Sequence, residues 1–243
     1  MNYKLQYKRY NENAILIDWP ALIDKNILED ILNFKLKIEN NKDKQIVEVI
    51  TAYSSLLIIY KLTIDNINDE FFSLKKLYAL KKDNKKTSLN HWQIPVCYDP
   101  VFGTDLEAFA KEKKLLISKV IELHTKPVYS IYFLGFLPGF LYLGGLDKHL
   151  FLDRKKVPKL DVKKGAVAIG GNQTGIYPKN SPGGWHVIGN SPIELFNPNA
   201  NIPCELKSGD TLSFYAITKS EYYKIAKAIS TSNYQIKPVL AND

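Results

Sequence analysis

Glycine divides this sequence into two regions of different character. All 13 glycines lie between Gly103 and Gly209, and the residues before Gly103 include none. Glycine permits the positive φ angles and close backbone approaches that tight turns require. The later region is therefore predicted to consist of short strands joined by glycine and proline turns. The earlier region is predicted to contain longer elements joined by polar turns.

The first hundred residues show alternating strand and helix patterns. Strands are predicted at 14–18, 46–50, 56–61 and 92–98, where β-branched and aromatic residues gather. One helix is predicted from Pro20 to Ile38 and another after Asn66 or Asn68, each with apolar residues on one face. This β-α-β-β-α-β order is that of the ferredoxin-like, or split βαβ, fold. We therefore predict an α+β domain over residues 1–100.

The remaining sequence is predicted to form a helical linker and an all-β barrel. Two short helices are expected over residues 101–126, because Thr104 and Glu107 have capping-box spacing and Ser118 can cap a second helix. Six short strand candidates follow, among them 193–196, and their density between Gly, Pro and Asn turns is typical of a small barrel. The barrel domain is expected over 127–243 and ends with a helix at 220–228.

The charge of the chain is positive but poor in arginine. The formal net charge is +8, and Arg9 and Arg154 are the only arginines among 33 basic residues. Proteins that read bases and phosphates favour the planar arginine fork, so nucleic acid is not a predicted partner. The lysine-rich runs at 75–86 and 148–164 are typical of solvated surfaces. Attraction of an anionic substrate or an acidic partner protein is the alternative.

The sequence also favours a cytoplasmic protein without membrane or metal. The apolar stretch at 129–146 is interrupted by glycine and proline, and the N-terminus lacks the apolar core of a signal sequence. Two cysteines cannot build a disulfide framework. The four histidines show no metal-ligand spacing, so no metal site is predicted.

Three glycine-rich segments are candidates for chemistry. Residues 135–145 alternate glycines with aromatic residues, although barrel corners and barrel filling explain these residues equally well. Residues 170–178 offer two carboxamides, a hydroxyl and a phenol to a small polar molecule. Residues 181–186 deliver an indole and an imidazole, and the alternative for His186 is a place in the barrel core. His124 is explained equally well as a helix cap.

These segments, with motifs that precede them, resemble the KipI family. The family is also called allophanate hydrolase subunit 1, or PxpB, the B subunit of the bacterial ATP-dependent 5-oxoprolinase. The resemblance runs from about Ala14 to Ala216. It is carried by Ile94-Pro95-Val96-Cys97-Tyr98, Phe102-Gly103-x-Asp105-Leu106, His124, Gly135-Phe136-x-Pro138-Gly139-Phe140-x-Tyr142-Leu143, residues 171–178, residues 181–185 and Ile188-Gly189.

The resemblance implies a cyclophilin-like barrel and a chain that works within a complex. The implied partners are a KipA-like protein (PxpC) and a LamB/YcsF-like protein (PxpA). Together such proteins open the lactam of 5-oxo-L-proline to L-glutamate with hydrolysis of ATP. ATP is thus the expected cofactor, bound by the complex or by this chain, with no metal beyond the Mg²⁺ that accompanies ATP. This chain alone is expected to have no activity.

Two other functions remain open at this point. The alternative reading is a regulatory protein that binds and inhibits a histidine kinase, as KipI does, since its motifs would be the same. Urea or allophanate processing in a biotin-linked carboxylase is a weaker expectation, because no amidase or biotin carrier is attached to this sequence.

The expected site lies where the barrel turns meet PxpC. His124 and His186 are the catalytic candidates. Lys159 stands where the family usually has arginine, which replaces a bidentate anion contact with a point charge. The substrate-binding candidates are Gly135, Pro138, Gly139, Phe140, Asn172, Gln173, Thr174, Gly175, Tyr177, Pro182, Gly183, Gly184 and Trp185.

Overall fold

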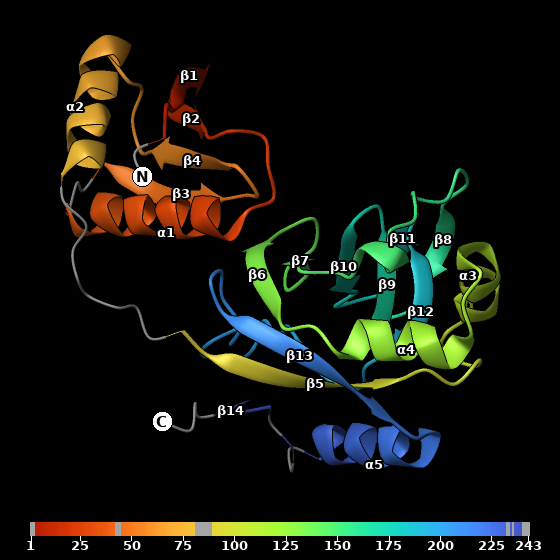
Figure 1. Ribbon diagram of the computed structural model, residues 1–243. Helices are drawn as coiled ribbons and strands as arrows, with labels where there is room; N and C mark the ends of the chain where they lie inside the picture. Colours follow the sequence, from red (N-terminus) through yellow and green to blue (C-terminus); the bar gives the residue numbers. More distant parts are fainter. Residues whose placement is uncertain (1–2, 42–44, 81–88, 232–233, 235, 240–243) are drawn as a thin grey trace. The chain divides into compact units, whose positions relative to one another are not determined.

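The chain folds into two compact units, residues 1–88 and 89–243. The computed structural model describes all residues except 1–2, 42–44, 81–88, 232–233, 235 and 240–243 (Figure 1). Each unit has its own cluster of buried apolar side chains. No helix in the described part of the chain combines the length and apolarity needed to cross a membrane.

The first unit is a four-stranded sheet with two helices, which confirms the α+β character predicted for it. The sheet has the order β1-β2-β4-β3 and antiparallel neighbours. Alternate residues of β4 are buried, and they pack against the apolar face of α1. The strands are β1 (Gln6–Asn11), β2 (Ala14–Asp18), β3 (Ile46–Thr51) and β4 (Ser55–Tyr60), and the helices are α1 (Lys25–Asn40) and α2 (Ile67–Ala79).

Both helices of the first unit begin at side-chain caps. The Asp24 carboxylate accepts hydrogen bonds from the backbone amides of Asn26 and Ile27, so α1 begins after the position expected from Pro20. Asn66 caps α2 in the same way, as predicted. Each cap satisfies amides that have no partner inside the helix.

The last strand of the predicted β-α-β-β-α-β order lies in the second unit. This strand, β5 (His91–Cys97), pairs in parallel with β13 (Thr211–Ile217) along its whole length. The exposed, polar β1, which was not predicted, instead occupies the edge of the first sheet beside β2. The first unit therefore ends near residue 88 rather than 100, and its sheet lacks the sixth element of the ferredoxin-like order.

The residues expected to form a linker belong to the second unit. Helices α3 (Leu106–Lys113) and α4 (Ile117–Thr125) place Phe109 and Val120 in the buried core of that unit. The expected caps do not form, because neither helix has a side-chain hydrogen bond at its N-cap. The Thr104 hydroxyl accepts a hydrogen bond from Lys159 instead.

The second unit is built on a closed barrel of seven strands, as the glycine pattern predicted. The strand order is β12-β9-β10-β7-β6-β13-β5, and a pairing between β12 and β5 closes the ring. Its likeness to cyclophilin stays a prediction. The further elements are β6 (Tyr129–Leu134), β7 (Leu141–Gly144), η1 (Lys148–Leu150), β8 (Lys159–Val162), β9 (Ala166–Gly170), β10 (Gln173–Ile176), β11 (Ser181–Gly183), β12 (His186–Asn190), α5 (Lys219–Ser230) and β14 (Pro238–Val239).

Two features beside the barrel bear on the sequence predictions. Strands β8 and β11 form a separate two-stranded ribbon, which carries the 181–183 turn. Residues 193–196, predicted as a strand, have no regular secondary structure. The predicted last helix is confirmed as α5, and Thr218 and Glu221 close a capping box at its start.

Candidate functional site

A cavity of about 280 Å³ opens on the barrel unit where several of the predicted turns meet. Drug-sized ligands occupy pockets of about 300–1,000 Å³, so a cavity of this size suits a small molecule. Besides residues of the predicted turns, the lining includes Arg154 and Pro158, which lie in the loop between η1 and β8. The cavity is lined by Phe136, Phe140, Tyr142, Arg154, Pro158, Tyr177, Pro182, Gly183, Gly184 and Trp185.

Aromatic rings form the walls of the cavity. The ring of Phe140 meets those of Tyr177 and Trp185 nearly edge to face, at centroid distances of 5.3 and 5.6 Å. Such pairs are favourable beyond the area that they bury. Burial raises the pKa of Tyr177 to about 12, and it also raises the pKa of Tyr142. Both phenols are therefore neutral hydrogen-bond donors at neutral pH.

Two glycines allow these rings to approach the backbone. A Cβ atom on Gly170 would lie 2.5 Å from Cδ1 of Trp185, and one on Gly183 would meet the hydroxyl of Tyr177. Neither glycine has a positive φ angle. These two glycines are therefore needed because they let the aromatic rings lie close to the backbone, and not because the backbone adopts an unusual conformation there.

Arg154 supplies the charge of the cavity. Its Cζ atom lies 5.7 Å from the centroid of the Trp185 ring, within the range of a cation–π contact. Arg154 also counteracts part of the rise that burial causes in the pKa of Tyr142 and Tyr177. Its positive charge therefore acts on the aromatic side of the cavity.

An ion-pair cluster fixes the loop that carries Arg154. The Asp105 carboxylate accepts hydrogen bonds from Lys155 at 2.6 Å and from Lys159 at 2.9 Å. It also accepts one from the backbone amide of Val187 at 2.8 Å. Burial on its own would raise the pKa of Asp105, but these hydrogen bonds outweigh it and hold the pKa below its usual value. This cluster ties the loop to β12.

The structure brings together the third predicted segment and parts of the first two. Phe140, Tyr177, Pro182, Gly183, Gly184 and Trp185 all line the cavity. Gly135, Pro138 and Gly139 line a neighbouring pocket of about 230 Å³, which shares Phe136 with the cavity.

Other predicted residues lie outside the cavity. Asn172 is exposed, and Gly175 is buried against Phe140 and Leu141. Gln173 has a buried side-chain oxygen without a hydrogen-bond partner in the described part of the chain. Buried acceptors are usually satisfied by a protein group or by ordered water. Thr174 is fully buried and binds His124.

His124 lies in the core of the barrel unit, with no exposed surface. Its Nε2 atom is 2.9 Å from the Thr174 hydroxyl, and its Nδ1 atom is 2.7 Å from the Tyr98 hydroxyl. Burial lowers its pKa to about 3. A catalytic group must touch the substrate, so this position suits a structural role better than the expected catalytic one.

His186 stands beside the cavity rather than in it. Its ring is half-buried, packs against Phe109 and lies with Nε2 2.9 Å from the backbone oxygen of Asp153. A carbonyl only accepts, so Nε2 carries the proton and donates it. His186 thereby holds the loop on which Arg154 sits.

Four lining residues were absent from the predicted set, namely Phe136, Tyr142, Arg154 and Pro158. Phe136 and Tyr142 belong to the motif at 135–143, and Phe136 has a φ of 62°, an uncommon value outside glycine. Arg154 belongs to the lysine-rich run at 148–164, whose pattern is typical of a solvated surface and leaves attraction of an anionic substrate as the alternative. The sequence feature that could have identified Arg154 as a site residue is that it is one of only two arginines.

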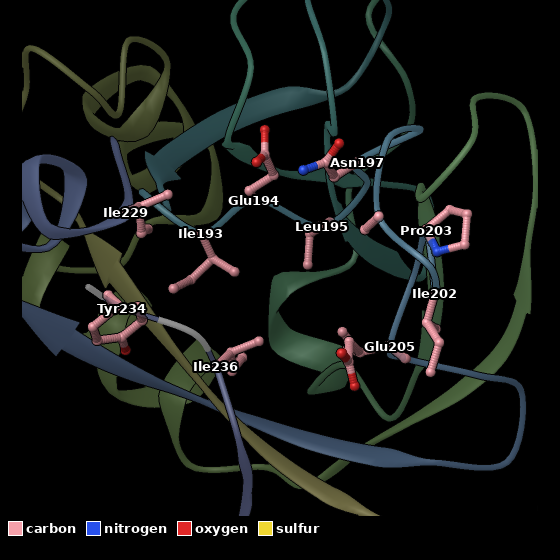
Figure 2. Close-up of a pocket in the computed structure, with 12 residues that line it drawn as sticks. Ile193, Glu194, Leu195, Asn197, Ile202, Pro203, Glu205, Ile229, Tyr234 and Ile236 are labelled. Carbon is pink, nitrogen blue, oxygen red and sulfur yellow. The ribbon is translucent and has the colours of Figure 1, made fainter. Parts of the chain in front are cut away.

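A second cavity of about 280 Å³ lies between the 193–206 segment and residues at and after the end of α5 (Figure 2). Most of the residues that line it are apolar, and Glu194 and Glu205 are among the others. The predicted site residues are not among those that line it.

Comparison with known proteins places the chain in a family. The family described as carboxyltransferase domain, subdomain C and D, matches residues 5–206. The B subunit of 5-oxoprolinase from Bacillus subtilis (strain 168) is 34% identical over 233 residues, which cover 92% of this chain and 97% of that protein. This chain belongs to the family of 5-oxoprolinase B subunits.

Two solved structures share the fold of this chain. The crystal structure of TTHA0988 is 30% identical with a TM-score of 0.74, and the match covers 84% of this chain and 40% of that one. The K. lactis urea amidolyase matches 98% of this chain and 16% of its own with a TM-score of 0.80. Its identity of 18% shows a shared fold alone.

Proposed function

We propose that this chain is the PxpB component of an ATP-dependent 5-oxoprolinase, which opens 5-oxo-L-proline to L-glutamate. The observation that carries the proposal is the similarity to the Bacillus subtilis relative over 97% of that protein. The aromatic cavity supports it as a place for the ring, because its volume of about 280 Å³ suits a small cyclic amide better than a nucleotide. ATP and its Mg²⁺ are therefore assigned to the complex.

The chain's own residues would bind and orient the lactam. The rings of Phe140, Tyr177 and Trp185 offer apolar contact to a five-membered ring, while the neutral phenols of Tyr142 and Tyr177 can donate hydrogen bonds to its carbonyl. ATP would supply a phosphoryl group to the lactam oxygen, which makes the lactam carbon a better electrophile for water and lets the oxygen leave as phosphate. Because a lactam is a stable amide, holding its carbonyl in one orientation favours this activation.

The partners proposed for the reaction are the KipA-like PxpC and the LamB/YcsF-like PxpA. Support for an interface comes from Val157 and Leu160, which are 80% and 85% exposed and flank Pro158 at the cavity. Exposed apolar side chains mark a protein interaction site where they form a contiguous patch, and these two residues are three positions apart beside the cavity. We assign the β8–β11 ribbon and the loop before it to the contact with PxpC.

Leu160→Asp is expected to weaken binding to PxpC by about tenfold or more, because burial of a leucine contributes roughly 1.5–3 kcal/mol. Isothermal titration calorimetry with a PxpC homologue measures the change. Leu116→Asp is the matched control, since Leu116 is 76% exposed and lies at the start of α4, outside the ribbon and the cavity lining. Equal affinities for the two variants would contradict the assignment.

The proposed function is tested by mixing this chain with PxpA and PxpC homologues, 5-oxo-L-proline and ATP. We expect L-glutamate to form, and to be lost when this chain is omitted. Glutamate formation that does not depend on this chain would refute the proposal. The relatives named above do not support the regulatory alternative, and inhibition of a histidine kinase by this chain alone would be the result that favours it.

A further inference from the structure

Arg154 is the one charged residue among those that line the aromatic cavity. Within the described part of the chain, no carboxylate forms a salt bridge with it. The neighbouring Lys155 and Lys159 differ, since both pair with Asp105. The guanidinium charge at the cavity is thus left for a ligand, whereas the two lysines beside it share the Asp105 carboxylate as a partner.

The backbone around Arg154 is held against the turn that carries Trp185. His186 Nε2 donates to the backbone oxygen of Asp153 at 2.9 Å. The backbone amide of Lys155 donates to the oxygen of Gly184 at 2.7 Å. The residues on both sides of Arg154 therefore bind the residues on both sides of Trp185. The backbone of Arg154 is thus held beside this turn, and its exposed guanidinium lies over the indole ring.

A guanidinium fixed beside aromatic walls matches one class of small molecule. The fork of N–H groups binds a carboxylate in bidentate geometry, which a lysine ammonium cannot reproduce. The walls accept the apolar edges and faces of a small ring. A neutral amide of the same size would leave the arginine charge without a partner.

We propose that Arg154 is the receptor for the carboxylate of a small cyclic amide, and that His186 is the positioning residue that holds Arg154 in place. This proposal rests on the function proposed above, because it treats the cavity as the lactam site. It makes the cavity selective for anionic lactams over neutral lactams and over urea.

Binding of two matched ligands tests this selectivity. The ligands are 5-oxo-L-proline and 2-pyrrolidinone, which is the same ring without the carboxylate. Dissociation constants are measured by ligand-observed NMR, with this chain alone and with a PxpC homologue present. We expect the carboxylate to improve affinity at least tenfold in the wild type. Arg154→Gln should remove that advantage, and Arg154→Lys should keep only part of it.

A neighbouring lysine provides the matched control for charge. Lys156→Gln changes the net charge by the same amount in the same loop, but Lys156 does not line the cavity. We expect this variant to retain the wild-type ratio of affinities. An equal loss in Lys156→Gln and Arg154→Gln would show general electrostatic attraction and overturn the proposal.

The role of His186 has its own readout. His186→Leu removes the donor to Asp153 and should reduce the affinity for 5-oxo-L-proline about tenfold, while the affinity for 2-pyrrolidinone stays unchanged. His186→Gln, which keeps an N–H donor, should restore part of the loss. A parallel loss for both ligands would indicate a merely structural role and overturn the assignment of His186.

The binding experiment and the activity experiment fail in different ways. Carboxylate selectivity without glutamate formation by the three-protein mixture would preserve the Arg154 receptor and refute the proposed reaction. If glutamate forms, but Arg154→Gln leaves the ratio of the affinities for 5-oxo-L-proline and 2-pyrrolidinone unchanged, the proposed reaction stands and the proposed role of Arg154 is refuted. Equal wild-type affinities for the two lactams, with and without the PxpC homologue, would also overturn it.

Discussion

Lowering the pH from 7 to 5 is expected to reduce the free energy of unfolding of the barrel unit by about 2 kcal/mol through His124 alone. Burial holds the pKa of His124 at about 3 in the folded protein, against an ordinary value of 6.5. The unfolded chain takes up this proton as the pH falls below 6.5, and the folded protein does not. Stability from this residue is therefore complete above pH 6.5 and falls by about 1.4 kcal/mol per pH unit toward pH 3.

The hydrogen bonds around His124 show why the folded protein excludes the proton. The Thr174 hydroxyl donates to the backbone oxygen of Ala168 at 3.0 Å, so it accepts from Nε2–H of His124. Nδ1 is then the acceptor for the Tyr98 hydroxyl. The chain of donors and acceptors is complete with a neutral ring. A second proton, on Nδ1, would displace the phenol hydrogen and leave a charge without a counterion in the core.

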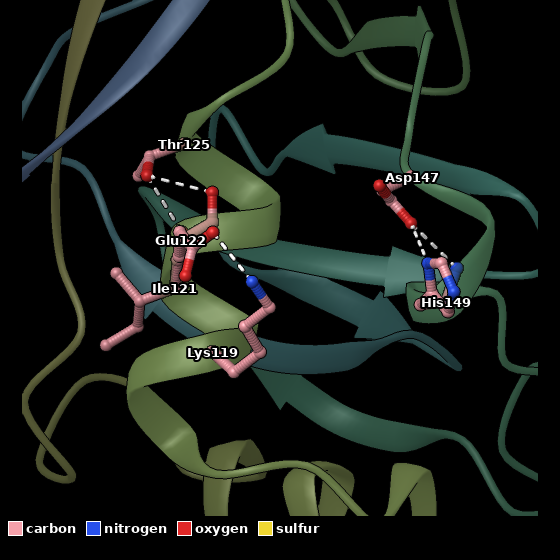
Figure 3. A network of polar contacts seen from close by, with 6 residues as sticks. All are labelled: Lys119, Ile121, Glu122, Thr125, Asp147 and His149. Carbon is pink, nitrogen blue, oxygen red and sulfur yellow. Dashed lines mark hydrogen bonds and ion pairs between the residues drawn. The ribbon is translucent and has the colours of Figure 1, made fainter.

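Urea denaturation between pH 7.5 and 5 measures this effect. A Trp19→Phe background restricts tryptophan fluorescence to Trp92 and Trp185, which both lie in the second unit. His124→Gln is expected to be less stable than the parent at pH 7.5, because it loses the stacking on Phe214, but its stability should vary less with pH. His149→Gln is the control, since His149 is exposed and hydrogen-bonded to Asp147 at the surface (Figure 3). Equal slopes for the parent and His124→Gln would show that the buried imidazole does not cause the pH dependence.

The sequence predicted the barrel because its signal is local. Glycine and proline turns limit strand length wherever they occur, and those turns are visible without knowing which strands pair. The place of β5 is different, since it pairs with β13, which follows it by about 120 residues, and its own pattern suits either unit equally well. Chain order alone therefore assigned this strand to the wrong sheet.

The candidate site shows the same contrast. Tyr177 and the residues 182–185 follow one another closely in the sequence, and the motif that contains them was recognised. Arg154 reaches the cavity through hydrogen bonds between Asp153 and His186 and between Lys155 and Gly184, about 30 residues apart. Such pairings leave no mark on local sequence pattern. The surroundings of His124 follow the same rule, because only the fold reveals that Tyr98 and Thr174 enclose it.

Gly183→Ala is expected to destabilise the barrel unit by about 2 kcal/mol and to reduce lactam binding at least tenfold, because the added methyl group would overlap the Tyr177 ring in the cavity wall. The new Cβ atom would meet the Tyr177 hydroxyl and lie 2.9 Å from Cε1 and Cζ of that ring. The Tyr177 ring is buried, packs edge to face on Phe140 and lines the cavity, so a displaced ring would press on Phe140 or enter the cavity. Relief requires the ring or β11 to shift, and either shift alters the cavity.

The adjacent glycine separates this contact from a general intolerance of the turn. Gly184 also lines the cavity, but a Cβ there would have Lys155 O at 3.7 Å and Pro158 Cγ at 3.9 Å as its nearest neighbours, which is ordinary packing. Neither glycine has a positive φ, so backbone strain does not distinguish the two substitutions.

Thermal melting and the affinity for 5-oxo-L-proline should change strongly in Gly183→Ala and little in Gly184→Ala. Adding Tyr177→Phe to Gly183→Ala removes the oxygen that the methyl group meets and should restore part of both losses. If Gly184→Ala were as damaging as Gly183→Ala, or if Tyr177→Phe restored nothing, the wall of the cavity would not depend on the approach of Tyr177 to Gly183.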